Sequence, residues 1–385
     1  MHVLGHLTVE EFLRDYWQKK PVLIRQAIPG FEPLLAADEL AGLSLEDDIE
    51  SRLIIEEGET GPWEVKKGPF TEADYRALPE NKWTLLVQAV DQWIPEAAEL
   101  LEHFRFIPSW RIDDLMISYA TDGGSVGPHW DQYDVFLLQA EGQREWRIGQ
   151  MCSERSSILD GPSVKILADF EETDRWVLSP GDMLYLPPGL AHWGISKGEC
   201  MTYSVGFRAP STAELLERSV DQILPELTQD NRYRDADLTC QSSPGEITDT
   251  AVTRLKQLLS EAIDQPERLS EALGTLMTEP KYEDHAPVYT ATDADWADAL
   301  AALSEYGQVQ RNPHARFAYS ASSTVIRLYC QGENIALPAS SHELIRYLCD
   351  NTALDAHQII AFAAGEAEQR LITDLLFCDL IGPAE

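Results

Sequence analysis

The stretch GPHWDQYDVFLLQAEGQREWRIG, residues 127–149, contains a histidine and an aspartate two residues apart, followed by two runs typical of β-strands. On extended backbone the side chains of His129 and Asp131 project to the same side, so they can bind one metal ion together. The run Val135–Gln139 follows at once, and Glu145–Ile148 repeats the pattern. The stretch therefore predicts a metal site within a β-rich unit.

Similar runs extend the β-rich unit in both directions. Glycine- or proline-rich turns separate them, and many short strands with such turns are typical of a sandwich or barrel. A helix should open the chain, because Thr8 and Glu11 form a capping box before an apolar face. A double-stranded β-helix of the jelly-roll type fits best. The expected strands are Val22–Ile24, Leu115–Ala120, Val135–Gln139, Glu145–Ile148, Met183–Leu186 and Met201–Phe207.

A third metal ligand must come from elsewhere in the chain, and His192 is the best candidate. It follows the turn Pro187-Pro188-Gly189, which places it at the start of another strand. Two histidines and one carboxylate form the facial triad of non-haem Fe(II) oxygenases, which leaves three coordination positions for a cosubstrate and dioxygen. The alternative is that His192 is a buried core histidine satisfied by hydrogen bonds.

Arg144 would complete such a site. A 2-oxo diacid chelates iron at one end and needs a cation for its far carboxylate, and a guanidinium offers a bidentate fork. The alternative for Arg144 is a surface arginine paired with Glu141 or Glu145. Tyr133 and Asp134 follow the first two ligands directly, so Asp134 could receive a cationic substrate. Otherwise Tyr133 packs under the site and Asp134 caps a turn.

The second half of the chain reads as helical and then as a small α+β domain. Residues 211–284 include an apolar helix face, which could close an intramolecular bundle or a dimer; its members are Val252, Leu255, Leu258, Leu259 and Ile263. Residues 285–385 should contain helices at Asp295–Leu303, His342–Leu348 and Glu366–Phe377, and a hairpin around Arg316–Ala336. With the β-rich residues 1–210, these ranges predict an α+β chain of three parts.

Composition excludes several classes of protein. The 385 residues carry a formal net charge of -35, which excludes a phosphate-tracking surface over most of the molecule and suits a basic protein partner by electrostatic steering. The six cysteines are scattered without a CxxC pair, so neither a zinc ribbon nor a disulfide framework is indicated. No apolar run reaches the roughly 18 residues of a membrane span, and the acids Glu10 and Glu11 oppose a signal peptide. We expect a cytoplasmic protein.

The order His129-x-Asp131, Arg144, His192 is similar to that of the JmjC-type 2-oxoglutarate oxygenases of the cupin superfamily. More closely, several segments resemble the bacterial ribosomal oxygenases of the YcfD (RoxA) type, strongly from Leu7 to Pro210 and more weakly beyond. The segments are YWQKKPVLIR (16–25), WRIDDLMISYA (110–120), residues 127–149, GDMLYLPPGLAHWG (181–194) and YSVGFRAP (203–210).

The resemblance implies an Fe(II)- and 2-oxoglutarate-dependent enzyme that uses dioxygen to hydroxylate an arginine side chain of large-subunit ribosomal protein sixteen. It also implies a homodimer, with a JmjC catalytic domain (1–210), a helical dimerisation region (211–284) and a winged-helix-like domain (285–385). Carried over by position, the three predicted ligands would bind iron and Arg144 would hold the far carboxylate. Ser204 is a further candidate for cosubstrate contact.

Other functions stay open. An oxygenase of this type could hydroxylate His or Asn in another protein, or demethylate lysine, for which Trp130 and Trp193 could supply an aromatic cage. A metal-binding cupin without oxygenase chemistry is a more remote alternative. A nucleic-acid-binding regulator is disfavoured, because acids outnumber bases from Ala291 onward. The glycine-rich loop Gly123–Gly127 lacks a following Lys-Ser/Thr and is not a phosphate loop.

Overall fold

The computed structural model describes residues 3–56, 61–159 and 164–384. The chain divides into two compact units, Met1–Ala209 and Pro210–Glu385. The sequence also predicts a boundary between residues 284 and 285. The two compact units do not test this boundary, which stays a prediction.

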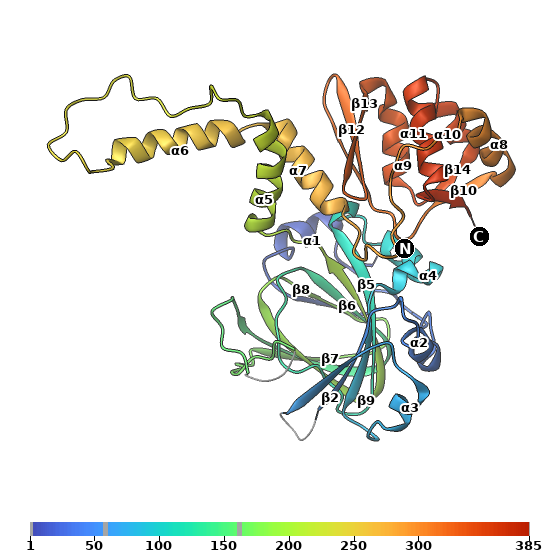
Figure 1. The fold of residues 1–385 in the computed structure, drawn as a ribbon. Coiled ribbons are helices and arrows are strands. Elements are labelled where there is room, and N and C mark those ends of the chain that lie inside the picture. The colour runs from blue at the N-terminus through green and yellow to red at the C-terminus, as the bar shows by residue number, and fades with distance from the viewer. Residues whose placement is uncertain (1–2, 57–60, 160–163, 385) are drawn as a thin grey trace. The chain divides into compact units, whose positions relative to one another are not determined.

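The first unit is built on one antiparallel sheet that curls into a barrel (Figure 1). The strands run in the order β1-β8-β6-β9-β5-β4-β2-β3, and β7 adds to β6. This arrangement confirms the predicted double-stranded β-helix. The strands are β1 (Val22–Ile24), β2 (Ser51–Glu56), β3 (Trp63–Lys67), β4 (Trp83–Val87), β5 (Ile112–Ala120), β6 (Val135–Met151), β7 (Asp174–Leu178), β8 (Met183–Leu186) and β9 (Leu190–Phe207).

Three strands are longer than the sequence predicts. Strand β5 begins at Ile112, three residues before the predicted Leu115. The runs Val135–Gln139 and Glu145–Ile148 belong to the single strand β6, and Met201–Phe207 is the end of the strand β9 that begins at Leu190. The β6–β9 ladder contains register shifts around Glu141. A β-bulge inserts a residue and bends the strand without ending it, which is why this segment reads as a turn in the sequence.

The two faces of the sheet bury different side chains. Phe136 and Leu138 pack into the main core with Phe12 of the first helix, whereas Val135 and Leu137 lie in a separate cluster with Trp146. The alternation follows from the two-residue period of a strand. The helices that contribute to this unit are α1 (Val9–Asp15, with the predicted capping box), α2 (Ala37–Leu43), α3 (Glu72–Arg76) and α4 (Pro95–Glu102), with 3-10 turns at Val90–Gln92 and Ser109–Arg111.

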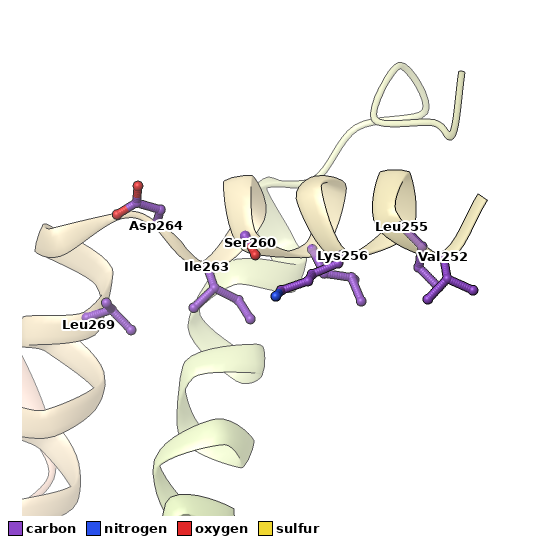
Figure 2. A pocket seen from close by; sticks show the side chains of 8 residues that line it. Val252, Leu255, Lys256, Ser260, Ile263, Asp264 and Leu269 are labelled. Carbon is purple, nitrogen blue, oxygen red and sulfur yellow. The ribbon is translucent and has the colours of Figure 1, made fainter. Parts of the chain in front are cut away.

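The second unit begins with three helices, α5 (Thr212–Ile223), α6 (Asp249–Ile263) and α7 (Pro266–Thr278). Helix α6 projects from the other two (Figure 1). The predicted apolar face is present on it and is exposed, with Val252, Leu255 and Leu259 about half accessible at 53%, 47% and 54%. Together with Leu269 of α7 these side chains line one shallow apolar groove (Figure 2).

The rest of the second unit is a small α+β fold with its own buried core, centred on residues such as Leu328, Ile345 and Leu375. The predicted hairpin is a three-stranded antiparallel sheet, because Glu333–Pro338 extends it by one strand. The elements are α8 (Trp296–Tyr306), β10 (Gln308–Arg311), β11 (Phe317–Ala321), β12 (Val325–Cys330), β13 (Glu333–Pro338), α9 (His342–Asp350), β14 (Ala353–Asp355), α10 (Ala356–Phe362), α11 (Glu366–Phe377) and β15 (Ile381–Pro383), with a 3-10 turn at Ala339–Ser341. A further 3-10 turn, Leu224–Glu226, directly follows α5.

Among the described residues, none of these helices combines the length and the apolar character needed to cross a bilayer.

Candidate metal centre

Two backbone hydrogen bonds bring the predicted histidine ligands together. The His129 N–H donates to the His192 carbonyl at 3.0 Å, and the His192 N–H donates back at 2.8 Å. The two rings consequently lie with their centroids 4.2 Å apart. His129 lies on extended backbone outside the named strands, whereas His192 lies near the start of β9, as predicted.

Hydrogen bonds at Nδ1 fix the orientation of both rings. His129 Nδ1 lies 2.9 Å from the Gly127 carbonyl, and His192 Nδ1 lies 3.0 Å from the Leu190 carbonyl. A carbonyl only accepts, so each Nδ1 carries the hydrogen and each Nε2 keeps its lone pair for a metal. Gly127 has φ 78°, a left-handed conformation that glycine adopts without a steric cost.

Asp131 supplies the negative charge of the site. Its Oδ2 lies 3.5 Å from His192 Nε2, and one ligand atom from each of the three residues lies within 4.8 Å of the others. Burial and the neighbouring His129 lower the pKa of His192 to about 4, so its imidazole is neutral near pH 7 and able to ligate. Two imidazoles and a carboxylate suit a divalent first-row metal such as Fe(II).

Arg144 lies on β6 and is almost fully buried. Its Nη1 donates to Ser118 Oγ at 3.5 Å, but Nε and Nη2 are buried and have no hydrogen-bond partner among the described residues. Leaving a buried charged donor unpaired is costly. These two nitrogens form the edge of the guanidinium that binds a carboxylate in a bidentate manner, so the residues fit a carboxylate ligand in this place.

Ser118 is a site residue that the sequence does not single out. It lies on β5, is buried, and contacts Arg144 through its hydroxyl while donating to the Thr202 carbonyl at 3.3 Å. A serine within an ordinary strand gives no sequence signal, since its role depends on which strand lies opposite. Ser204 on β9 is paired with Met116 of β5 and Leu137 of β6 and is also buried.

The two predicted substrate contacts have different surroundings. Tyr133 is 43% exposed, and the negative charge of nearby Asp131 raises the pKa of its hydroxyl well above the usual value. Asp134 is fully buried, and burial raises its pKa. Its carboxylate accepts hydrogen bonds from Tyr185 at 2.6 Å and Gln18 at 2.9 Å. These contacts favour a structural role for Asp134 over direct contact with a substrate.

Comparisons with known proteins agree with this geometry. Residues 99–215 match the JmjC domain, and residues 261–380 match the ROXA-like winged helix. The chain is 40% identical to the ribosomal protein uL16 3-hydroxylase of Escherichia coli over 72% of its own length and 73% of that protein.

Two solved structures of Escherichia coli YcfD are also similar to this chain. The X-ray structure of YcfD has a TM-score of 0.85 with 32% identity, covering 99% of both chains. A second structure, of the ribosomal oxygenase YcfD in complex with cobalt and 2-oxoglutarate, has a TM-score of 0.79 with 33% identity over 96% of this chain and 97% of the other.

Proposed function

Because this chain belongs to the JmjC-domain ribosomal oxygenases, we propose that it is an Fe(II)- and 2-oxoglutarate-dependent hydroxylase of an arginine side chain in large-subunit ribosomal protein sixteen. The observation that carries the reaction class is the unpaired, buried edge of Arg144 on β6, the strand whose Ile148 pairs with the metal-ligand candidate His192 of β9. The geometry offers a metal at one end of a 2-oxo diacid and a cation at the other.

Under this proposal His129, Asp131 and His192 hold the iron. Arg144 binds the far carboxylate of 2-oxoglutarate, Ser118 fixes the guanidinium, and Ser204 is a further contact for the cosubstrate. Once bound, Fe(II), 2-oxoglutarate and dioxygen supply the oxidising power for inserting one oxygen atom into a C–H bond. The protein's part is to point two imidazole Nε2 atoms at the metal, to orient the diacid between two fixed ends, and to hold the substrate at the open side.

A cationic substrate agrees with the charges around Tyr133. The carboxylates of Asp131, Asp114 and Asp113 all raise the pKa of its hydroxyl, so this half-exposed ring lies in a negative field. A guanidinium can stack on an aromatic face and pair with carboxylates at the same time. Asp134 is buried, so its carboxylate could contribute to this negative field but could not contact the substrate directly. The net charge of -35 favours encounter with a basic ribosomal protein in the cytoplasm.

Lysine demethylation has less support. The predicted cage residue Trp193 donates its indole N–H to Ser125 at 2.8 Å, and the Arg147 guanidinium lies over its ring at 4.9 Å. Phe170 packs against the same ring edge-on at 6.0 Å. A ring face that an arginine already covers is not available for a methylammonium group.

The substrate assignment is tested by mass spectrometry. Recombinant large-subunit protein sixteen, incubated with the enzyme, Fe(II) and 2-oxoglutarate, should gain the mass of one oxygen atom on an arginine peptide, with succinate formed in equal amount. The control omits 2-oxoglutarate. Succinate formation with oxidation only at a histidine or asparagine, or only in another ribosomal protein, would contradict the arginine assignment and leave the reaction class intact.

For the whole chain we propose a catalytic domain (1–210), a helical dimerisation region (211–284) and a winged-helix-like domain (285–385). The exposed apolar groove on α6 and α7 supports the dimer, since a second copy would cover leucine and valine side chains that are otherwise in water (Figure 2). We do not expect direct contact with nucleic acid, given the acidic charge.

The dimer has its own prediction. The double variant Leu255→Glu, Leu259→Glu should convert a dimer into a monomer, because it places two charges in the buried centre of the interface. Light scattering during gel filtration measures the mass. The matched control is Gln257→Lys, an exposed substitution on the same helix outside the groove, which should leave the mass unchanged. A dimeric double variant would locate the interface elsewhere.

A further inference from the structure

Trp146 lies beside the candidate metal centre, yet neither the motifs nor the proposed function gives it a role. It is on β6 two residues after Arg144, so both side chains project to the same face of the sheet. Its side chain is buried, with 4% of the residue exposed. Its indole Nε1 is also buried and has no hydrogen-bond partner in the part of the chain that the structure describes. Such a donor is rare unless something outside the chain accepts from it.

The indole ring lies next to both ends of the proposed cosubstrate site. The guanidinium carbon of Arg144 is 5.7 Å from the ring centroid, and the imidazole of His192 is 5.8 Å away, centroid to centroid. Gly194, which pairs with Trp146 in the β6–β9 ladder, lets the ring approach, since a Cβ there would come within 2.7 Å of it. The ring therefore has little freedom to move between the cation and the metal ligand.

Three unpaired, buried donors belong to these two neighbouring side chains: Nε and Nη2 of Arg144, and Nε1 of Trp146. A carboxylate has about four lone-pair sites, so a bidentate guanidinium leaves acceptor capacity unused. At the other end of the site the three metal ligands have no donor to spare for a ligand oxygen, because both histidine Nδ1 atoms are taken by backbone carbonyls. The indole N–H is thus best matched to the carboxylate that Arg144 binds.

We propose that Trp146 is a cosubstrate-binding residue whose indole N–H donates a hydrogen bond to the far carboxylate of the bound 2-oxo diacid, beside the Arg144 guanidinium. This inference rests on the proposed function, since it assumes that the diacid is the ligand. It adds to that function a third donor for the carboxylate. It also explains why an indole, and not merely an aromatic ring, occupies this position of β6.

The test compares two ligands that differ only at the far end. Protein loaded with Co(II), without oxygen, is titrated by calorimetry with 2-oxoglutarate and with 2-oxopentanoate, which has a methyl group where the far carboxylate would be. In Trp146→Phe the dissociation constant for 2-oxoglutarate should rise about tenfold or more, as expected for loss of a hydrogen bond to a charged group. The constant for 2-oxopentanoate should stay within about twofold, because that ligand has no acceptor there.

Two further variants keep the result interpretable. Trp176 pairs with Trp146 in the β6–β7 ladder and packs against the apolar cluster that contains Trp146. The control variant Trp176→Phe should therefore bind both ligands as the parent protein does. If Trp146→Phe does not fold, Trp146 can be replaced by β-(3-benzothienyl)alanine, in which sulfur stands where the N–H was and the shape of the ring is kept.

Each outcome separates the inference from its premise. Equal weakening of both ligands would mean that the ring acts by packing alone, and unchanged binding of 2-oxoglutarate would mean that the N–H has no role; either result overturns the proposal for Trp146. Failure of the parent protein to bind 2-oxoglutarate at all, with Co(II) bound, would instead refute the proposed function.

Discussion

Replacing Asp131 by alanine should reduce 2-oxoglutarate turnover by at least about a thousandfold, because a bound metal contributes several kcal/mol to such reactions and this change removes a ligand. Asp131 is the only carboxylate of the three-residue set, so the two imidazoles that remain cannot supply a negative charge to the metal. Two imidazoles alone would hold Fe(II) weakly and leave its charge uncompensated.

The fold should survive this change. The backbone of Asp131 is held independently of its side chain, since its carbonyl accepts a hydrogen bond from the Gly189 N–H at 2.7 Å. The side chain is partly exposed, at 23% of its surface. Loss of the carboxylate also removes a charge 3.5 Å from His192 Nε2. We expect this loss to lower metal affinity and to leave the stability of the barrel unchanged. We therefore expect a melting temperature close to that of the parent protein.

Succinate release and metal content together check this prediction. The matched control is Asp169→Ala, which removes an exposed carboxylate outside the site and should retain full turnover. Asp131→Asn keeps the size of the side chain but not its charge, and it separates the two effects. Substantial succinate formation by Asp131→Ala would exclude this residue from the metal centre.

The features that the sequence predicts well are those encoded by local spacing. His129 and Asp131 could be grouped in advance because residues two apart on extended backbone project to one side, and the proline-glycine turn placed His192 at the start of a strand. The structure brings the ligand atoms of all three within 4.8 Å of one another. The capping box of α1 and the apolar face of α6 follow from equally local patterns.

The remainder depends on contacts between distant segments. Ser118 and Trp146 read as ordinary strand residues, and only the pairing of β5, β6 and β9 places them around Arg144. From the sequence Asp134 is either a substrate contact or the cap of a turn, but Gln18 and Tyr185, which are remote in the sequence, donate hydrogen bonds to its carboxylate. A pattern within a few residues contains no information on such partners. For the same reason the sequence divides β6 into two strands, since its bulge is recognisable only from the pairing with β9.

Substitution of Arg144 should separate ligand affinity from stability. Arg144→Gln should weaken binding of 2-oxoglutarate by about 100-fold or more, since removing one partner of a buried charge pair has costs of this size. In the ligand-free protein the same change removes a buried guanidinium edge that has no partner among the described residues. Its desolvation penalty then disappears, so the ligand-free variant should be as stable as the parent protein or more stable.

Thermal melting with and without the cosubstrate measures both effects. Adding Co(II) should raise the melting temperature of both proteins. Adding 2-oxoglutarate as well should raise it further for the parent protein but not for Arg144→Gln. Arg144→Lys should fall between them, because an ammonium keeps the charge but loses the bidentate geometry.

Arg147→Gln is the matched control for this experiment. Arg147 is the next arginine on β6, but it pairs with Glu145 at 3.0 Å and lies over Trp193, away from the unpaired donors. Its loss should leave affinity for 2-oxoglutarate unchanged and lower stability slightly, the reverse of the pattern at Arg144. If Arg144→Gln destabilised the ligand-free protein and left 2-oxoglutarate affinity intact, Arg144 would be a structural residue and the anion site would have to lie elsewhere. An arginine that binds a ligand carboxylate stays unpaired in the empty site, so it lowers the stability of the ligand-free protein and raises its affinity for the ligand. Arg144 should show both effects, and Arg147, which is already paired, should show neither.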